Sequence, residues 1–211
     1  FIDSGAEDPY FFGTIIIDCS NDGYLNLIDG QQRTTTFLLL LKAMHLCIID
    51  VLNNMASTEE AAGLRRSLQQ SLDSIYEILY HADVRKQIEI EKNWNKAKGI
   101  KILENASINE LYKDDLRNII EARTYYDAEK AVYKFPRKQK DNKYTNFFRN
   151  FKSFYEKLHS YQESNLDVLV NGFLNRCQII EIKSWQIEQA ITMFNSLNST
   201  GMPLSDADII S

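Results

Sequence analysis

The sequence predicts an α+β fold in which a small mixed β-sheet carries a large helical insertion. Three observations predict it. Two strand patterns separated by a turn signal stand near the N-terminus, and a third strand pattern follows at 177–185. Between them, residues 58–175 carry apolar side chains mostly at the three- and four-residue spacing of helices. We therefore expect a single domain over residues 1–211, with core motifs at 10–52 and 177–211.

The first two strands are expected to form a β-hairpin. Residues 10–18 are rich in aromatic and β-branched side chains, which suit a pleated surface. The tripeptide Asn21-Asp22-Gly23 is typical of a tight turn, and the short apolar run 24–28 follows it. The hairpin would place Asp29 directly after its second strand.

A long helix over about residues 32–52 is expected to be central, because it is apolar nearly all round apart from Lys42 and His45. A second helix follows Thr58, whose hydroxyl suits an N-cap. Further helices are predicted from an aromatic stripe over 147–158, from 165–174 and from 187 onward. At helical spacing such a stripe is more typical of a core than of a base-stacking platform. The alternation of residues 87–91 favours a short strand.

The polar segment Asp29–Arg33 joins the hairpin to the central helix. Gly30 permits a sharp backbone turn, and Thr34–Thr36 offer hydroxyls for an N-cap. A strand, a glycine turn and a helix N-terminus together can bind an anion, because the helix dipole favours negative charge there. Arg33 would then be a forked donor to phosphate, Gln31 and Gln32 neutral donors, and Asp29 a Mg²⁺ ligand or water-orienting carboxylate. The alternative is an ordinary strand–helix connection whose polar groups cap one another.

Two motifs far apart in the chain carry a family resemblance. Residues 27–43 read LIDGQQRTTTFLLLLKA, and residues 194–208 read FNSLNSTGMPLSDAD. On these motifs the chain resembles the GmrSD restriction-endonuclease N-terminal domain family, whose signature is a DGQQR motif. The second motif matches the family pattern at Phe194, Asn198, Gly201, Leu204 and Asp208. Thr34 stands where the family usually has leucine, and the family's opening segment of the Ile-Pro-x-Tyr-Gln-Arg type is absent.

The resemblance implies a ParB/sulfiredoxin-like core and a nucleotide-dependent role in restricting modified phage DNA. It implies NTP with Mg²⁺ as cofactor, DNA as a partner through the full-length protein, and a nuclease domain or subunit elsewhere. The expected catalytic residues are Asp29, Gln31, Gln32 and Arg33, with Asp29 as the Mg²⁺ ligand. The expected nucleotide-binding residues are Gly30, Arg33, Thr34, Thr35, Asn198, Gly201 and Asp208.

A competing hypothesis is a non-hydrolytic DNA-binding or protein-adaptor module on the same fold, because fold alone does not decide function. NTP hydrolysis is thus left open, whereas nuclease activity is not expected. The histidines His45, His81 and His159 lack the spacing of a nuclease metal site, and no arrangement of acidic residues indicates a two-metal site.

Composition favours a cytoplasmic protein without a membrane span. Cys19, Cys47 and Cys177 are far apart and form no CxxC pair, which is typical of reduced thiols. No apolar run of about 18 residues or signal-peptide pattern occurs. Because the chain begins at Phe1 and a helix signal at Ser205 is cut short at Ser211, we expect a fragment truncated at both ends.

Charge is distributed unevenly along a chain of net charge −5. Residues 1–60 hold nine acidic residues against Arg33 and Lys42 alone, so Arg33 is one of two cations in an acidic segment. Residues 134–143 hold five basic residues and one acid. This stretch is open to two interpretations, a non-specific nucleic-acid contact or a solvated loop.

Overall fold

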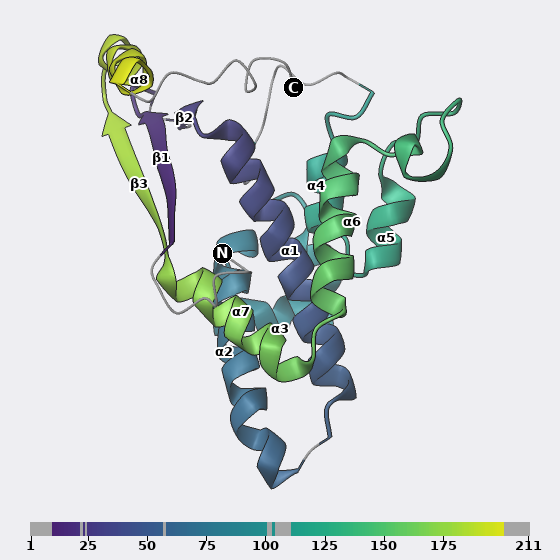
Figure 1. The fold of residues 1–211 in the computed structure, drawn as a ribbon. Helices are drawn as coiled ribbons and strands as arrows, with labels where there is room; N and C mark the ends of the chain where they lie inside the picture. The colour runs from purple at the N-terminus through teal and green to yellow at the C-terminus, as the bar shows by residue number, and fades with distance from the viewer. Residues whose placement is uncertain are drawn as a thin grey trace. The chain divides into compact units, whose positions relative to one another are not determined.

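The computed structural model describes residues 10–200 except 22, 24, 57, 101, 102 and 104–110, and it divides into two compact units (Figure 1). The sheet unit comprises Asp8–Arg33 and Cys177–Ser211. The helical unit comprises Thr34–Arg176. The predicted α+β class, with its hairpin and mixed sheet, is confirmed, while the ParB/sulfiredoxin-like likeness stays a prediction.

The sheet unit is built around a central strand, β1 (Tyr10–Asp18). On one side β2 (Asn26–Asp29) pairs with it antiparallel, which is the predicted hairpin. On the other side β3 (Cys177–Ser184) pairs with it parallel, as a long crossover connection permits. The strand order is β2-β1-β3, and the register of the β1–β2 pair puts Asp29 opposite Ile16 of the central strand.

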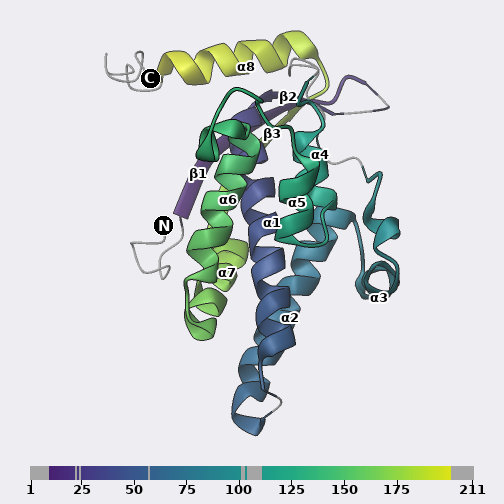
Figure 2. The same ribbon diagram turned by 90° about the vertical axis from the view of Figure 1, so that its right-hand side faces the viewer.

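Helix α8 (Ile187–Thr200) completes the sheet unit and contacts all three strands. Figure 2 shows it running across the strands. Ile16 and Ile17 of β1 and Ala190 of α8 are buried. The β-branched residues predicted to form this strand therefore provide buried apolar surface in the sheet unit.

The helical unit packs its helices around α1 (Gln31–Asn54), whose bounds lie within two residues of the prediction. All residues from Leu38 to Ile48 except Leu40 are buried, including Lys42 and His45. The other elements of this unit are α2 (Glu59–Tyr80), α3 (Val84–Lys92), the 3₁₀ helix η1 (Trp94–Ala97), α4 (Asp115–Glu121), α5 (Tyr125–Ala131), the 3₁₀ helix η2 (Lys140–Lys143), α6 (Asn146–His159) and α7 (Glu163–Arg176).

The aromatic stripe predicted at 147–158 is the core face of α6. Phe148 and Phe151 are fully buried, and Tyr125 of α5 stacks on Phe151 and Tyr155 with ring centroids 5.8 and 4.7 Å apart. Stacked and edge-on aromatic pairs add to the stabilisation that burial already provides. The predicted N-cap at Thr58 is also confirmed, since its hydroxyl accepts from the Ala61 N–H at 3.3 Å.

Two local predictions are wrong. Residues 87–91 are not a strand but part of α3, because Asp83 caps that helix by accepting from the Lys86 N–H at 2.8 Å and Ile90 is buried. Thr34–Thr36 do not cap α1, because the helix already begins at Gln31 and they lie inside it. In both cases the helix begins before the segment for which another structure was predicted.

By length and composition, α1 is apolar enough to cross a membrane, a test that buried core helices also pass. In the structure, 56% of the 18-residue apolar stretch of this helix is buried. The helix is surrounded by the hydrophobic side chains of the helical unit, which fits a core helix.

Candidate functional site

The predicted polar turn is a sharp connection between β2 and α1 whose conformation depends on Gly30. Gly30 is buried and has φ +90°, a region that favours glycine. A Cβ at this position would lie 2.5 Å from Cγ2 of Ile15, so a side chain does not fit. The helix starts at the next residue, which places Gln31, Gln32 and Arg33 in its first turn.

Arg33 folds back over the hairpin. Its Nη1 donates to the Thr14 carbonyl oxygen at 2.6 Å. A Cβ on Gly13, which has φ +94°, would lie 3.2 Å from Nη2 of Arg33, and one on Gly30 would lie 3.4 Å from Nη1. The two glycines therefore leave the space in which the guanidinium lies, and one arm of its fork already binds the protein.

The remaining side chains of the turn have distinct positions. Gln31 is exposed, and its Nε2 donates to the Leu27 carbonyl oxygen at 2.9 Å. Gln32 is exposed as well, while Asp29 is half-buried at the end of β2. Thr34 and Thr35 are half-buried in the second turn of α1. The structure thus brings the whole first motif into one strand–turn–helix segment.

The electrostatics of this segment suit an anion. The N-terminus of a helix carries about half a positive charge from aligned peptide dipoles, and here it is joined by the guanidinium of Arg33. The first turn of α1 contains no acidic residue, although Asp29, two residues before the helix, brings one negative charge close to it. Such a combination of a dipole end and a planar donor is able to bind a phosphate group.

Asp29 is the residue of this turn that could hold Mg²⁺. Its carboxylate is a hard oxygen donor, and magnesium is commonly bound by one or two carboxylates together with substrate phosphates and water. Its half-buried position directly before Gly30 leaves it beside the phosphate-binding candidate. A single carboxylate fits a metal held jointly with a nucleotide better than a metal held by protein alone.

The second motif is described only in part. Asn198 lies near the end of α8, the helix that contacts all three strands of the sheet unit. Gly201 and Asp208 lie outside the described residues. Because Asn198 and Asp208 are expected to bind the same nucleotide as the Asp29–Arg33 turn, at least one of them should lie near that turn, and this stays a prediction.

Asp18 is a buried carboxylate that sequence reasoning did not single out. It accepts from the Ser20 backbone N–H at 2.9 Å and from Nδ2 of Asn26 at 3.3 Å. Hydrogen bonds from the side chain and backbone of Ser20, assisted by Asn26, lower the pKa of this carboxyl. Its partners close the hairpin, so its role is structural; an aspartate at the end of a strand pattern, three residues before a turn tripeptide, was the available signal.

The helical unit contains a buried polar cluster that the sequence did not predict. Nζ of Lys42 donates to Oη of Tyr80 at 2.7 Å and to the Ala122 carbonyl oxygen at 2.6 Å, with the Trp94 ring centroid 5.2 Å away. His45 lies edge-on to Tyr76, with ring centroids 5.0 Å apart. Burial lowers the pKa of both Lys42 and His45 well below their ordinary values.

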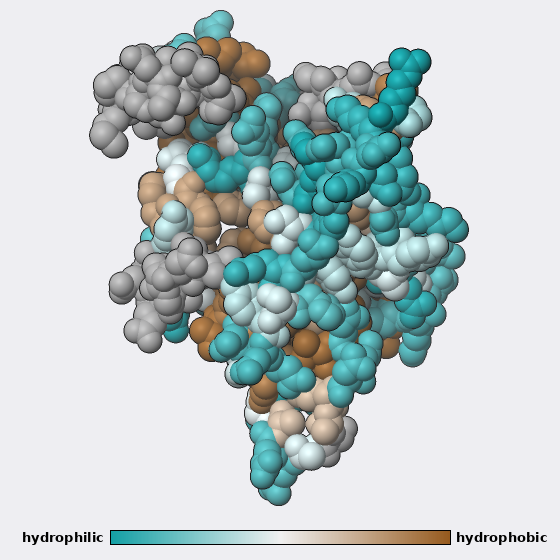
Figure 3. All heavy atoms as spheres, turned by 45° about the vertical axis from the view of Figure 1, so that its right-hand side comes forward, coloured by the Kyte–Doolittle hydropathy of each residue, from teal (hydrophilic) through white to brown (hydrophobic). Residues whose placement is uncertain are grey.

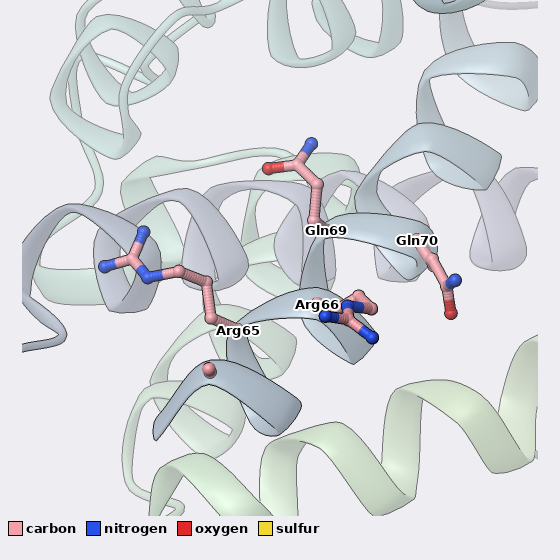
Figure 4. Close-up of a pocket in the computed structure, with 5 residues that line it drawn as sticks. Arg65, Arg66, Gln69 and Gln70 are labelled. Carbon is pink, nitrogen blue, oxygen red and sulfur yellow. The ribbon is translucent and has the colours of Figure 1, made fainter. Parts of the chain in front are cut away.

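Two hollows on the described surface of the helical unit lack the character of an active site. The larger, with a volume of about 410 Å³, is a shallow depression along α2 from which Arg65, Arg66, Gln69 and Gln70 extend separately (Figure 4). Arg65 is engaged with the Leu52 and Met55 carbonyl oxygens at the end of α1. The smaller hollow includes Cys47, whose thiol has a pKa raised to about 12 by burial and is therefore a poor nucleophile.

Within the described part of the chain, no group of three or more His, Cys, Asp or Glu side chains is arranged to hold a metal ion. The free cysteines Cys19, Cys47 and Cys177 form no disulfide there.

Comparison with known proteins gives a family assignment. Residues 1–211, the whole chain, match the family described as "GmrSD restriction endonuclease, N-terminal domain". No curated protein matches the sequence. The match covers both motifs on which the resemblance depends, so the chain belongs to the family of GmrSD restriction endonuclease N-terminal domains.

Proposed function

We propose that this chain is the nucleotide-binding, regulatory domain of a cytoplasmic, modification-dependent restriction protein, and that the Asp29–Arg33 turn binds the phosphates of an NTP. The observation that carries the proposal is the guanidinium of Arg33, which lies over Gly13 and Gly30 beside the positive end of α1. A planar donor next to a helix dipole complements a phosphate in both charge and geometry. Family membership supports the restriction context.

Each residue of the turn has a separate proposed task. Arg33 contacts phosphate oxygens, while Gly30 lets the backbone approach them closely. Thr34 and Thr35 are proposed contacts from the second helical turn. Asn198, Gly201 and Asp208 are proposed to complete the nucleotide site from the second motif.

Hydrolysis of the bound NTP needs neutralised phosphate charge and a positioned water. Mg²⁺, when bound with the nucleotide at Asp29, would supply the charge neutralisation that the helix and Arg33 begin. Gln31 and Gln32 are exposed amides that can accept from and donate to a water molecule. We assign them, with Asp29, to orienting the attacking water. DNA and a nuclease domain or subunit are the proposed partners, and nucleotide turnover is proposed to act on DNA restriction through them.

Replacing Arg33 tests the phosphate assignment. We expect Arg33→Lys to weaken NTP–Mg²⁺ binding roughly 10-fold or more, nearly as much as Arg33→Ala, because an ammonium cannot reproduce the guanidinium fork and a charged hydrogen bond contributes roughly 1.5–3 kcal/mol. Isothermal titration calorimetry with ATP and GTP measures the effect.

The matched control is Arg117→Ala, which removes an exposed arginine that pairs with Asp114 at 2.6 Å. It should leave nucleotide affinity unchanged. Because Arg33 also bonds Thr14, circular dichroism must first show that each variant is folded. Two folded Arg33 variants with wild-type affinity would rule out the phosphate role, and the adaptor hypothesis would then be preferred.

A second prediction is that residues 1–211 do not cleave DNA, with or without nucleotide. Cleavage of phosphodiesters commonly uses metal ions held by several ligands. Modified and unmodified phage DNA should stay intact when incubated with the purified chain, Mg²⁺ and each NTP. Nicking that persists through purification yet disappears in Asp29→Ala would contradict this assignment and place a nuclease centre at the turn.

A further inference from the structure

The basic stretch between α5 and α6 is an ordered projection, which we call the basic finger (residues 134–144). Lys134 and Tyr144 form an antiparallel bridge, and the Phe135 N–H donates to the Lys143 carbonyl oxygen at 2.7 Å. The Lys138 N–H donates to the Phe135 carbonyl oxygen at 3.1 Å, which closes a turn. Figure 1 shows this segment projecting from the ends of α5 and α6. It is therefore not the unstructured loop that a run of charges commonly indicates.

Aromatic side chains and one ion pair anchor the finger to the helical unit. Tyr144 is 4% exposed, its ring centroid lies 4.6 Å from that of Phe148, and its hydroxyl donates to Glu129. Asp141, the acidic residue of the finger, pairs with Lys152 of α6 at 2.6 Å. The carboxylate of Asp141 is thus engaged by Lys152 of α6.

Most cations of the finger are solvent-exposed and stand outside the ion pairs of the described residues. Lys134, Arg137, Lys138 and Lys140 are exposed and Lys143 is half-buried. Among the ion pairs formed by the described residues, none includes these five cations. Lys138 and Lys143 lie over aromatic rings, 4.7 Å from the centroid of Phe135 and 4.8 Å from that of Tyr144. These cation–π contacts position the two ammonium groups without an ion-pair partner within 4 Å among the described residues, although Asp141 also interacts electrostatically with Lys143.

The backbone at the tip of the finger is strained at a basic residue, Lys140. Lys140 has φ +50°, a left-handed conformation that is unfavourable for a residue with a Cβ atom. Glycine or asparagine would adopt it more readily. Strained positions persist where the surrounding structure enforces them, and they cluster at binding sites.

We propose that the basic finger binds the phosphate backbone of duplex DNA. A rigid group of lysines and an arginine on an otherwise acidic chain matches the closely spaced negative charges of a duplex. The tip residues 136–142 carry no large apolar side chain to insert into a membrane, and the rings of Phe135 and Tyr144 are already occupied by lysines, which disfavours base stacking with single strands. The surface on the α5 and α6 side is mainly hydrophilic (Figure 3). The choice of DNA rests on the proposed function.

The test is fluorescence anisotropy of a labelled 20-base-pair duplex with the 211-residue protein, measured over a series of salt concentrations. The triple variant Arg137→Gln, Lys138→Gln, Lys140→Gln should bind at least 10-fold more weakly. The slope of log affinity against log salt should fall by about 0.9 for each phosphate group that the variant no longer neutralises. The control Arg85→Gln, Lys92→Gln, Lys98→Gln removes one arginine and two lysines from the α3 region of the same unit and should cost less than threefold.

A second variant separates binding from folding. Lys140→Gly relieves the left-handed strain and removes one charge, so it should raise the unfolding temperature while weakening duplex binding. If Lys140 had only a structural role, the substitution would change the unfolding temperature but not duplex binding. Nucleotide titration gives an independent readout: finger variants should bind NTP normally, and Arg33 variants should bind duplex normally.

Several outcomes would overturn the proposal. Equally weakened binding in the finger and control variants would show a general charge effect. Binding of single-stranded DNA or duplex RNA with no binding of duplex DNA would assign the finger to another nucleic acid. Binding to phosphatidylserine vesicles, but not to any nucleic acid, would assign it to a lipid surface.

Discussion

Replacing Gly30 by alanine should destabilise the sheet unit by about 3 kcal/mol. Part of this destabilisation is conformational, because φ +90° is costly for any residue with a Cβ. The remainder is steric, since the new Cβ would lie 2.5 Å from Cγ2 of Ile15, a branched side chain of the central strand with little freedom to move. Because Gly30 also adjoins Arg33, nucleotide affinity should fall together with stability.

Hydrogen–deuterium exchange of peptides from β1 and β2 measures this effect in the sheet unit itself, which matters because a chain of two units need not unfold in one step. The control is Gly63→Ala in α2. A Cβ at Gly63 would meet nothing within 4 Å, so alanine there should stabilise the helical unit by about 0.5–1 kcal/mol. Unchanged protection of the hairpin in Gly30→Ala would contradict the steric argument.

The parts of the fold that sequence predicted well carry strong local signals. The strand pattern of 10–18, the Asn-Asp-Gly turn and the long apolar helix each agree with their surroundings over many residues. The strand prediction at 87–91 failed because five alternating residues fit a strand as well as a helix. Asp83, which decides between them by capping α3, lies outside that window.

The sequence predicted the turn of the candidate site but not the contacts of its side chains. Residues 29–33 are consecutive, so Gly30 and Arg33 had to lie in the same short segment. That Arg33 would bond Thr14 depends on the register between β1 and β2, which shifts between Ile16 and Ile17, and on the space that Gly13 leaves. Tertiary register of this kind has no local sequence signature. The finger illustrates the same limit, because only the fold shows that its acid forms an ion pair with a lysine of α6.

Lys42 shows why charge in a helix is hard to interpret from sequence alone. In an apolar helix a single lysine is usually placed at the surface with its charge in water. Here its side chain is fully buried beside His45, and it is satisfied by Tyr80 and the Ala122 carbonyl oxygen rather than by a carboxylate. Desolvation lowers the pKa of Lys42 well below the ordinary value, although Asp127 opposes the shift.

This lowered pKa predicts a strong pH dependence of stability. Between the folded pKa of Lys42 and the unfolded value of about 10.4, the unfolded chain binds a proton that the folded chain does not. The free energy of unfolding should therefore rise with pH through this window, by up to about 1.4 kcal/mol per pH unit, and fall as the solution is acidified. His45, whose pKa burial also lowers, adds to the destabilisation below about pH 6.5.

Lys42→Met should remove the lysine contribution to this slope. The substitution keeps most of the buried volume but leaves the Ala122 carbonyl oxygen without its donor, at a cost of roughly 1–3 kcal/mol that does not depend on pH. The variant should accordingly be less stable than the wild type at pH 9 and gain on it steadily as the pH is lowered to 6. Denaturant unfolding at a series of pH values gives the two curves, with the exposed Lys157→Met as the control for the change of residue type. Parallel curves for wild type and Lys42→Met would mean that Lys42 keeps its proton in the folded core, stabilised there by the rings of Tyr80 and Trp94 that lie 5.5 and 5.2 Å away.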